Sequence, residues 1–151
     1  QDAGLVFDLL IRRRESPAAL AVAAQLPELS FVLDHAGKPG IDAGEWDGWT
    51  SWFGRLAELP NVSCKLSGLV TEASWTDWRS QGVEQYLHEV LERFGPSRTL
   101  FGSDWPVSLL AAPYAEVFEL AWGSTAELSD AEREAVFGGT ATRVYDLQEA
   151  S

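Results

Sequence analysis

The chain has 151 residues, of which 46% are hydrophobic, so it is long enough to bury one globular core. It carries 11 Lys and Arg against 23 Asp and Glu, and a formal charge of -12 would repel nucleic-acid phosphates. No apolar run approaches the roughly 18 residues of a membrane span, and no export leader is visible. A single cysteine, Cys64, cannot form an internal disulfide. We expect a cytoplasmic protein without nucleic-acid or membrane partners.

Four short apolar segments alternate with longer segments of helical periodicity. The expected strands are residues 5–11, 31–35, 62–68 and 99–103, the first of them buried on both faces. Expected helices begin at Ser16-Pro17, as an N-cap and first-turn pair, at Trp46, and near Val83 with its end at Gly95-Pro96. The tail predicts a helix over 114–122, a capping box at Ser129 and a last turn over 141–145 after Gly138-Gly139.

This repeated strand-helix order predicts an α/β fold with parallel strands. Two architectures fit it: a small, open, doubly wound sheet, or half of a (β/α)8 barrel, which takes about 250 residues when whole. The chain starts with Gln, contains no Met and reaches its first strand almost at once. We therefore expect one domain over 1–151 that is a piece of a longer protein, namely a half barrel.

Functional side chains of parallel sheets gather at the carboxyl ends of the strands. The polar residues expected at that end are Asp34, His35, Lys38, Lys65, Ser67 and Asp104.

His35 is the stronger of the two histidine candidates. A neutral imidazole can bind a metal, polarise a carbonyl or carry a proton. His88 lies in a predicted helix between Leu87 and Glu89, and we expect it to be structural. For His35 the competing interpretation is a loop residue or a hydrogen-bonded core histidine.

Asp104 follows the fourth predicted strand, where a carboxylate can take a proton from water. Ser-Asp and Trp-Pro are also ordinary turn residues, so a role in starting a turn is the alternative.

Lys65 shares one face of its predicted strand with Ser63 and Ser67, opposite the apolar face. In a barrel the polar face points inward, and an inward lysine must be paired because burying a lone charge is costly. We expect it to pair with a carboxylate or a substrate anion; the alternative is that it merely lines an open edge of the sheet.

The seven tryptophans fall into two main groups. Three recur at helical spacing and are expected to pack in the core: Trp46, Trp49 and Trp52. Three others are expected in loops at the functional end, where an indole ring could contact a ligand such as a sugar: Trp75, Trp78 and Trp105. Glycine-rich phosphate loops, paired-cysteine motifs and the serine-hydrolase elbow are absent, so nucleotide binding has little support.

Four motifs in order resemble the landmarks of the amidohydrolase-related (amidohydrolase 2) family. They are LDHAGKP (33–39), CKLSG (64–68), LFGSDWPV (100–107) and FGGTATRVYDL (137–147). Within the family, the motifs are most similar to those of the fucono-, rhamnono- and galactono-lactonases, with 2-pyrone-4,6-dicarboxylate lactonase as a more distant relative. The resemblance covers essentially the whole chain, whose strands would be strands five to eight of the barrel.

The resemblance implies hydrolysis of a sugar lactone by activated water. It implies that His35 polarises the carbonyl or binds a metal, that Asp104 is the general base, and that Lys65 and Trp105 contact substrate. It implies either one divalent metal, zinc or a similar ion, with His35 and Asp104 among its ligands, or a metal-free reaction. The family's His-x-His on strand one has no counterpart here, so we expect this chain alone to be inactive or very weak.

Two other functions remain open at this stage. The same fold with a metal can decarboxylate aromatic acids in other branches of the family. Alternatively, a half barrel exposes strand edges that invite self-association, and the chain would then be a non-catalytic interaction module.

Overall fold

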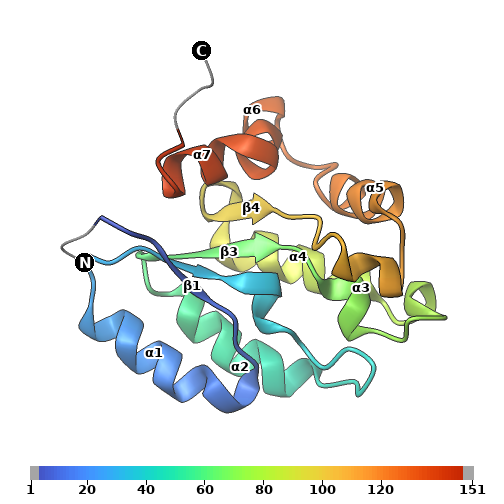
Figure 1. Cartoon of the computed structure of the whole chain (residues 1–151), viewed down its shortest axis with the longest axis horizontal. Helices are drawn as coiled ribbons and strands as arrows, with labels where there is room; N and C mark the ends of the chain where they lie inside the picture. Colours follow the sequence, from blue (N-terminus) through green and yellow to red (C-terminus); the bar gives the residue numbers. More distant parts are fainter. Residues whose placement is uncertain (1–3, 148–151) are drawn as a thin grey trace.

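The computed structural model describes residues 4–147, which contain one parallel sheet in the order β1-β2-β3-β4 (Figure 1). The strands are β1 Phe7–Leu9, β2 Phe31–Leu33, β3 Val62–Leu66 and β4 Thr99–Phe101. Each strand pairs with the next one along the chain, in parallel. An open doubly wound sheet reverses its strand order at a switch point. The unbroken order therefore favours the half barrel.

Seven α-helices follow or flank these strands within residues 4–147. They are α1 Ser16–Gln25, α2 Trp46–Ala57, α3 Leu69–Glu72, α4 Val83–Phe94, α5 Tyr114–Ser124, α6 Asp130–Glu134 and α7 Thr140–Val144. Short 3-10 turns occupy Arg13–Glu15, Asp34–Gly37, Trp78–Ser80, Pro96–Arg98 and Val107–Leu110. In this part of the chain, no helix has both the length and the apolar character that crossing a membrane requires.

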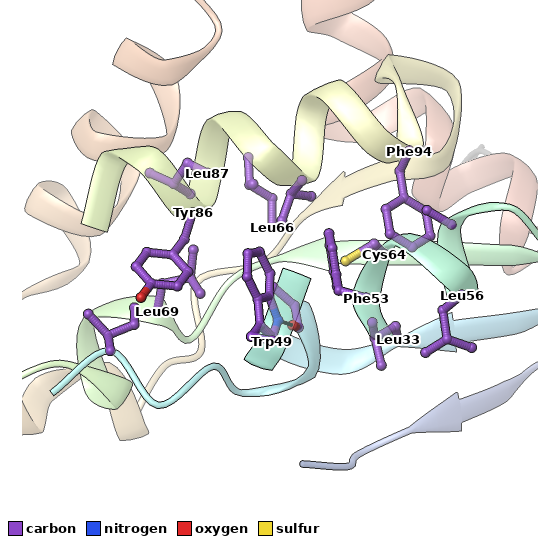
Figure 2. Packing of buried hydrophobic residues seen from close by; sticks show 14 of the residues in the cluster. Leu33, Trp49, Phe53, Leu56, Cys64, Leu66, Leu69, Tyr86, Leu87 and Phe94 are labelled. Carbon is purple, nitrogen blue, oxygen red and sulfur yellow. Dashed lines mark hydrogen bonds between the residues drawn. The ribbon is translucent and has the colours of Figure 1, made fainter. Parts of the chain in front are cut away.

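The core lies between the sheet and helices α2 and α4 (Figure 2). Cys64 and Leu66 on β3 are buried there, as their alternation with polar residues predicted. The ring of Trp49 stacks on Phe53 at 4.3 Å and lies 5.1 Å from that of Tyr86 on α4. Aromatic pairs at these distances add to the free energy gained from burial. The core role predicted for the tryptophans of 46–52 is confirmed.

The first strand differs from its prediction. It spans only three residues, and Leu5 and Phe7 are 72% and 55% exposed. Burial on both faces was wrong because β1 pairs with β2 alone and forms an edge of this sheet. In a complete barrel this edge would be paired.

Several helix boundaries follow local sequence rules. The predicted stop of α4 is confirmed at Gly95, whose φ of +68° suits a residue without a side chain. Ser129 and Glu132 form the predicted capping box of α6. Ser16 does not cap α1: it is the first helical residue, and its hydroxyl donates to the carbonyl of Arg13.

The last helical segment also departs from expectation. Gly138 and Gly139 were expected to separate two helices, yet they lie in a π-helical stretch, Ala135–Gly139, that joins α6 to α7. The carboxyl-terminal helices follow β4 along its free edge (Figure 1). This placement brings Tyr145 back towards β1, where its hydroxyl donates to Asp8.

Candidate active site

Three polar side chains from successive strand ends meet at the carboxyl edge of the sheet. Nδ1 of His35, after β2, lies 2.8 Å from the hydroxyl oxygen of Ser67, after β3. Nε2 of the same ring lies 3.6 Å from a carboxylate oxygen of Asp104, after β4. The sequence therefore placed His35 and Asp104 at the correct end of the sheet, and the structure brings them together.

The backbone at these positions takes the left-handed conformation. The φ angles of His35 and Asp104 are 52° and 55°, values that non-glycine residues rarely adopt. The expected second strand, 31–35, ends at Leu33 for this reason, and the turn redirects the imidazole. Strained backbone of this kind clusters at functional sites and persists where surrounding contacts hold it.

Gly68 makes room for the imidazole. A Cβ at this position would lie 2.7 Å from His35 Cγ, and the Gly68 φ of +68° is itself unfavourable for other residues. Both the close approach of His35 and the positive φ explain why the last residue of the CKLSG motif is glycine.

Burial lowers the pKa of His35 below its ordinary 6.5, with the positive charges of Lys38 and Lys65 adding to the effect. The carboxylates of Asp104 and Asp34 act in the opposite direction but do not overcome burial. The imidazole is therefore neutral near pH 7. Neutral imidazole carries one proton, on either Nδ1 or Nε2.

The neighbours of the ring favour the proton on Nε2. An ionised carboxylate can only accept hydrogen bonds, so Asp104 stabilises an N–H on the nitrogen that faces it. The Ser67 hydroxyl then donates to Nδ1 of His35, completing the arrangement. The result is a neutral imidazole with a donor next to a carboxylate.

Asp104 is held from two directions. Its side chain is 10% exposed, and its second carboxylate oxygen lies 3.4 Å from the Thr71 hydroxyl, whose shorter hydrogen bond, 2.8 Å, goes to the carbonyl of Gly68. Its backbone carbonyl accepts from the amide of Ser108 at 2.8 Å. Its carboxylate keeps lone pairs free to accept a proton from a bound water.

Lys65 lies on the polar face of β3 within a small charged network. Its ammonium is 2.6 Å from Asp34 and 3.4 Å from Asp8, and Tyr145 donates to Asp8 at 2.6 Å. Burial alone lowers the pKa of Lys65, but the nearby Asp34 carboxylate and Tyr145 hydroxyl outweigh it and raise the pKa. The lysine is therefore a permanent cation paired with protein carboxylates. Its contact with substrate stays a prediction.

The loop tryptophans divide by exposure. Trp105, beside Asp104, is 64% exposed, and Trp75 is 53% exposed, so both rings can be reached by a ligand. Trp78 is only 5% exposed, because the turn Trp78–Ser80 buries its ring in the core. The prediction that Trp78 could contact a ligand was wrong. His88 is exposed on α4.

A metal would find few ligands among residues 4–147. No group of three or more His, Cys, Asp or Glu side chains is arranged to hold an ion in that range. His35 and Asp104 are two donors, whereas a catalytic zinc site takes three protein ligands. The donors that the structure describes, within residues 4–147, do not by themselves fit a metal.

Some residues that contact the site were not predicted from the sequence. Thr71, on the short helix α3, lies outside the predicted strands and helices, and nothing in the sequence around it indicated a contact with Asp104. Asp8 was visible as the one charge in an apolar strand, which could have marked it as a partner for Lys65. Tyr145 was named only as the end of a helix.

Comparisons with known proteins identify the family to which the chain belongs. Residues 1–147 match the family model described as Amidohydrolase. The chain belongs to the amidohydrolase family. It is 46% identical to an L-fucono-1,5-lactonase of Burkholderia multivorans, over 95% of the chain and 52% of that relative. An L-rhamnono-gamma-lactonase of Scheffersomyces stipitis is 27% identical over 95% of the chain and 50% of its own length.

A solved structure has the same arrangement of strands and helices. An amidohydrolase from Burkholderia multivorans with bound zinc superposes with a TM-score of 0.89 at 45% identity, over 95% of the chain and 53% of that protein. The predicted α/β fold is confirmed, and the sheet corresponds to half of a (β/α)8 barrel. The chain spans about half the length of the curated relatives it matches.

Proposed function

We propose that this chain supplies half of the active site of a hydrolase that opens sugar lactones. The observation that carries the proposal is the pairing of a neutral, hydrogen-bonded His35 with Asp104, 3.6 Å apart at the sheet's carboxyl edge. The identity to an L-fucono-1,5-lactonase supports a six-membered sugar lactone as the substrate class. The bound zinc of the related structure supports a divalent metal in the complete site.

In the proposed reaction, Asp104 accepts a proton from a water molecule whose oxygen attacks the lactone carbonyl. Nε2–H of His35 donates to the carbonyl oxygen as it gains negative charge. The ring C–O bond then breaks, and Asp104 returns its proton to the leaving alkoxide. The products are a carboxylic acid and a free hydroxyl, so no oxidant or further reactant is needed.

Other residues would bind the substrate. The exposed ring of Trp105, beside Asp104, would pack against the apolar face of a sugar. Lys65 would attract the carbonyl or product carboxylate while keeping Asp34 as its partner. We derive no step through a metal, because its remaining ligands lie outside this chain. For the same reason we propose that residues 1–151 alone turn over little or no lactone.

The test is an assay of the full-length parent with L-fucono-1,5-lactone and other sugar lactones, following acid release. A second arm measures carbon dioxide release from aromatic carboxylic acids, which a decarboxylase of this family would produce. Lactone-dependent acid release without carbon dioxide supports the proposal. Carbon dioxide release without lactone turnover would overturn it.

A further inference from the structure

A buried carboxylate links three loops at the carboxyl edge of the sheet. Glu72, at the end of α3, has a side chain that is only 7% exposed. It accepts from both terminal nitrogens of Arg12, after β1, at 2.6 and 3.1 Å. It also accepts from the ammonium of Lys38, after β2, at 2.7 Å. The loops that follow β1, β2 and β3 therefore meet at one side chain.

The loop after β2 is the one that carries the catalytic candidate. Residues 35–38 all have positive φ, with 52° at His35 and 51° at Lys38. The amide of Lys38 donates to the His35 carbonyl at 2.8 Å, closing the turn. Consecutive left-handed residues do not hold this shape unaided, so contacts from outside must keep it.

Glu72 supplies two of these contacts. Its side chain binds Lys38, and its backbone carbonyl accepts from the amide of Asp42 at 3.1 Å, further along the same loop. We propose that Glu72 is a positioning residue that acts through Lys38 to hold the His35 imidazole against Ser67 and Asp104. The link to lactone hydrolysis rests on the proposed function, whereas the placement of the ring does not.

Charge explains why this contact matters more than a surface ion pair. Exposed pairs contribute little because water screens them. Here one carboxylate of low exposure pairs with two cations, Arg12 and Lys38, through charge-assisted hydrogen bonds. Without the negative charge these two cations would face each other and repel, and the left-handed turn would lose its outer anchor.

The two histidines of the chain make the test direct. In the 151-residue protein with ¹⁵N-labelled histidine, nuclear magnetic resonance reports the imidazole nitrogens of His35 and His88 separately. In Glu72→Gln we expect the His35 signals to shift and broaden towards a mixture of tautomers while those of His88 stay in place. The matched control is Glu89→Gln, which removes a carboxylate of similar exposure from the Glu89–Arg93 pair on α4. It should move His88 and leave His35 unchanged.

A second variant keeps the inference testable if Glu72→Gln does not fold. Lys38→Met leaves the Arg12–Glu72 pair intact and removes the link to the turn. It also removes a positive charge that lowers the His35 pKa, so its spectra are compared at a mildly alkaline pH, where the imidazole is neutral in both proteins. It should change the His35 signals in the same direction. His35 signals that match the wild type in either folded variant would overturn the inference.

Measuring kcat together with the His35 resonances distinguishes the positioning role of Glu72 from the proposed lactone hydrolysis. In the full-length parent, Glu72→Gln should lower kcat for lactone about 10- to 100-fold, as misplacing a catalytic group does. Altered His35 signals with an unchanged kcat would leave the placement of the ring standing. That combination would count against the catalytic role of His35.

Discussion

The hydroxyl of Ser67, after β3, lies 2.8 Å from Nδ1 of His35, after β2, so a residue at the end of one strand holds the imidazole at the end of the preceding strand. Ser67 is only 5% exposed, and removing its hydroxyl leaves a buried nitrogen without its partner. We predict that Ser67→Ala lowers kcat of the full-length parent about 10- to 100-fold. Steady-state lactone kinetics measure the loss, and imidazole resonances report the change in tautomer.

Ser63→Ala is the control for this substitution. Ser63 lies on the same face of β3 and is 8% exposed, but it is four residues from Ser67 along the strand. Its replacement should leave kcat within about twofold of the wild type, the range of a mutation without a special role. Equal losses in the two variants would mean that the strand, and not the Ser67–His35 hydrogen bond, is what activity requires.

Gly68→Ala tests how closely β3 packs against His35. The new methyl group would lie 2.8 Å from Cβ of His35, so rotating the imidazole cannot relieve the contact and the backbone must move. Gly44→Ala has nearly the same φ, +67°, and meets no atom within 4 Å.

Chemical denaturation of both glycine variants separates strain from crowding. Gly44→Ala should lower the free energy of unfolding by about 1 to 2 kcal/mol, the usual cost of a left-handed alanine. Gly68→Ala should cost clearly more and should also shift the His35 resonances. Equal costs and an undisturbed His35 would show that Gly68 serves only the turn.

The raised pKa of Tyr145 predicts that the free energy of unfolding falls at alkaline pH. Burial and the hydrogen bond to Asp8 raise its pKa to about 12 from 10.0, although Lys65 opposes the shift. Above pH 10 the unfolded chain loses this proton while the folded chain keeps it, so the free energy of unfolding falls as pH rises towards 12. In Tyr145→Phe the fall over this interval should be shallower.

Urea unfolding at several pH values on both sides of pH 10 measures this slope. Tyr114→Phe is the control, because it removes the hydroxyl of a tyrosine that is 51% exposed. The control should follow the wild-type slope. A Tyr145→Phe slope equal to that of the wild type would mean that Tyr145 ionises as readily in the folded chain as in the unfolded one.

The order of strands and helices could be predicted from the sequence because local sequence signals determine it. Apolar period, capping residues and Gly95-Pro96 place α4 and the β3 core residues correctly. The errors lie where tertiary context decides. The first strand is apolar enough for a barrel interior, yet here it is a sheet edge, and the exposure of Phe7 depends on strands that this chain does not contain.

In the candidate site, too, the residues set by local rules were predicted and those set by tertiary contacts were not. His35 and Asp104 could be predicted because the carboxyl ends of parallel strands share one edge, whatever the loops do. The roles of Thr71 and Glu72 could not, since each acts on a residue more than thirty positions away. Which residues they contact depends on the left-handed backbone at His35 and Asp104. The sequence indicated a turn at Asp104 but not the direction in which its side chain would point.

The proposed reaction requires Asp104 to act as the general base, and replacing its carboxylate by an amide tests this role. Asp104→Asn keeps the shape of the side chain but removes its ability to take a proton from water. In the full-length parent we predict that kcat for sugar-lactone hydrolysis falls about 100- to 10,000-fold, with an unchanged circular dichroism spectrum. Asp47→Asn, an exposed aspartate on α2, should keep wild-type kcat. A folded Asp104→Asn enzyme with near wild-type kcat would contradict the account.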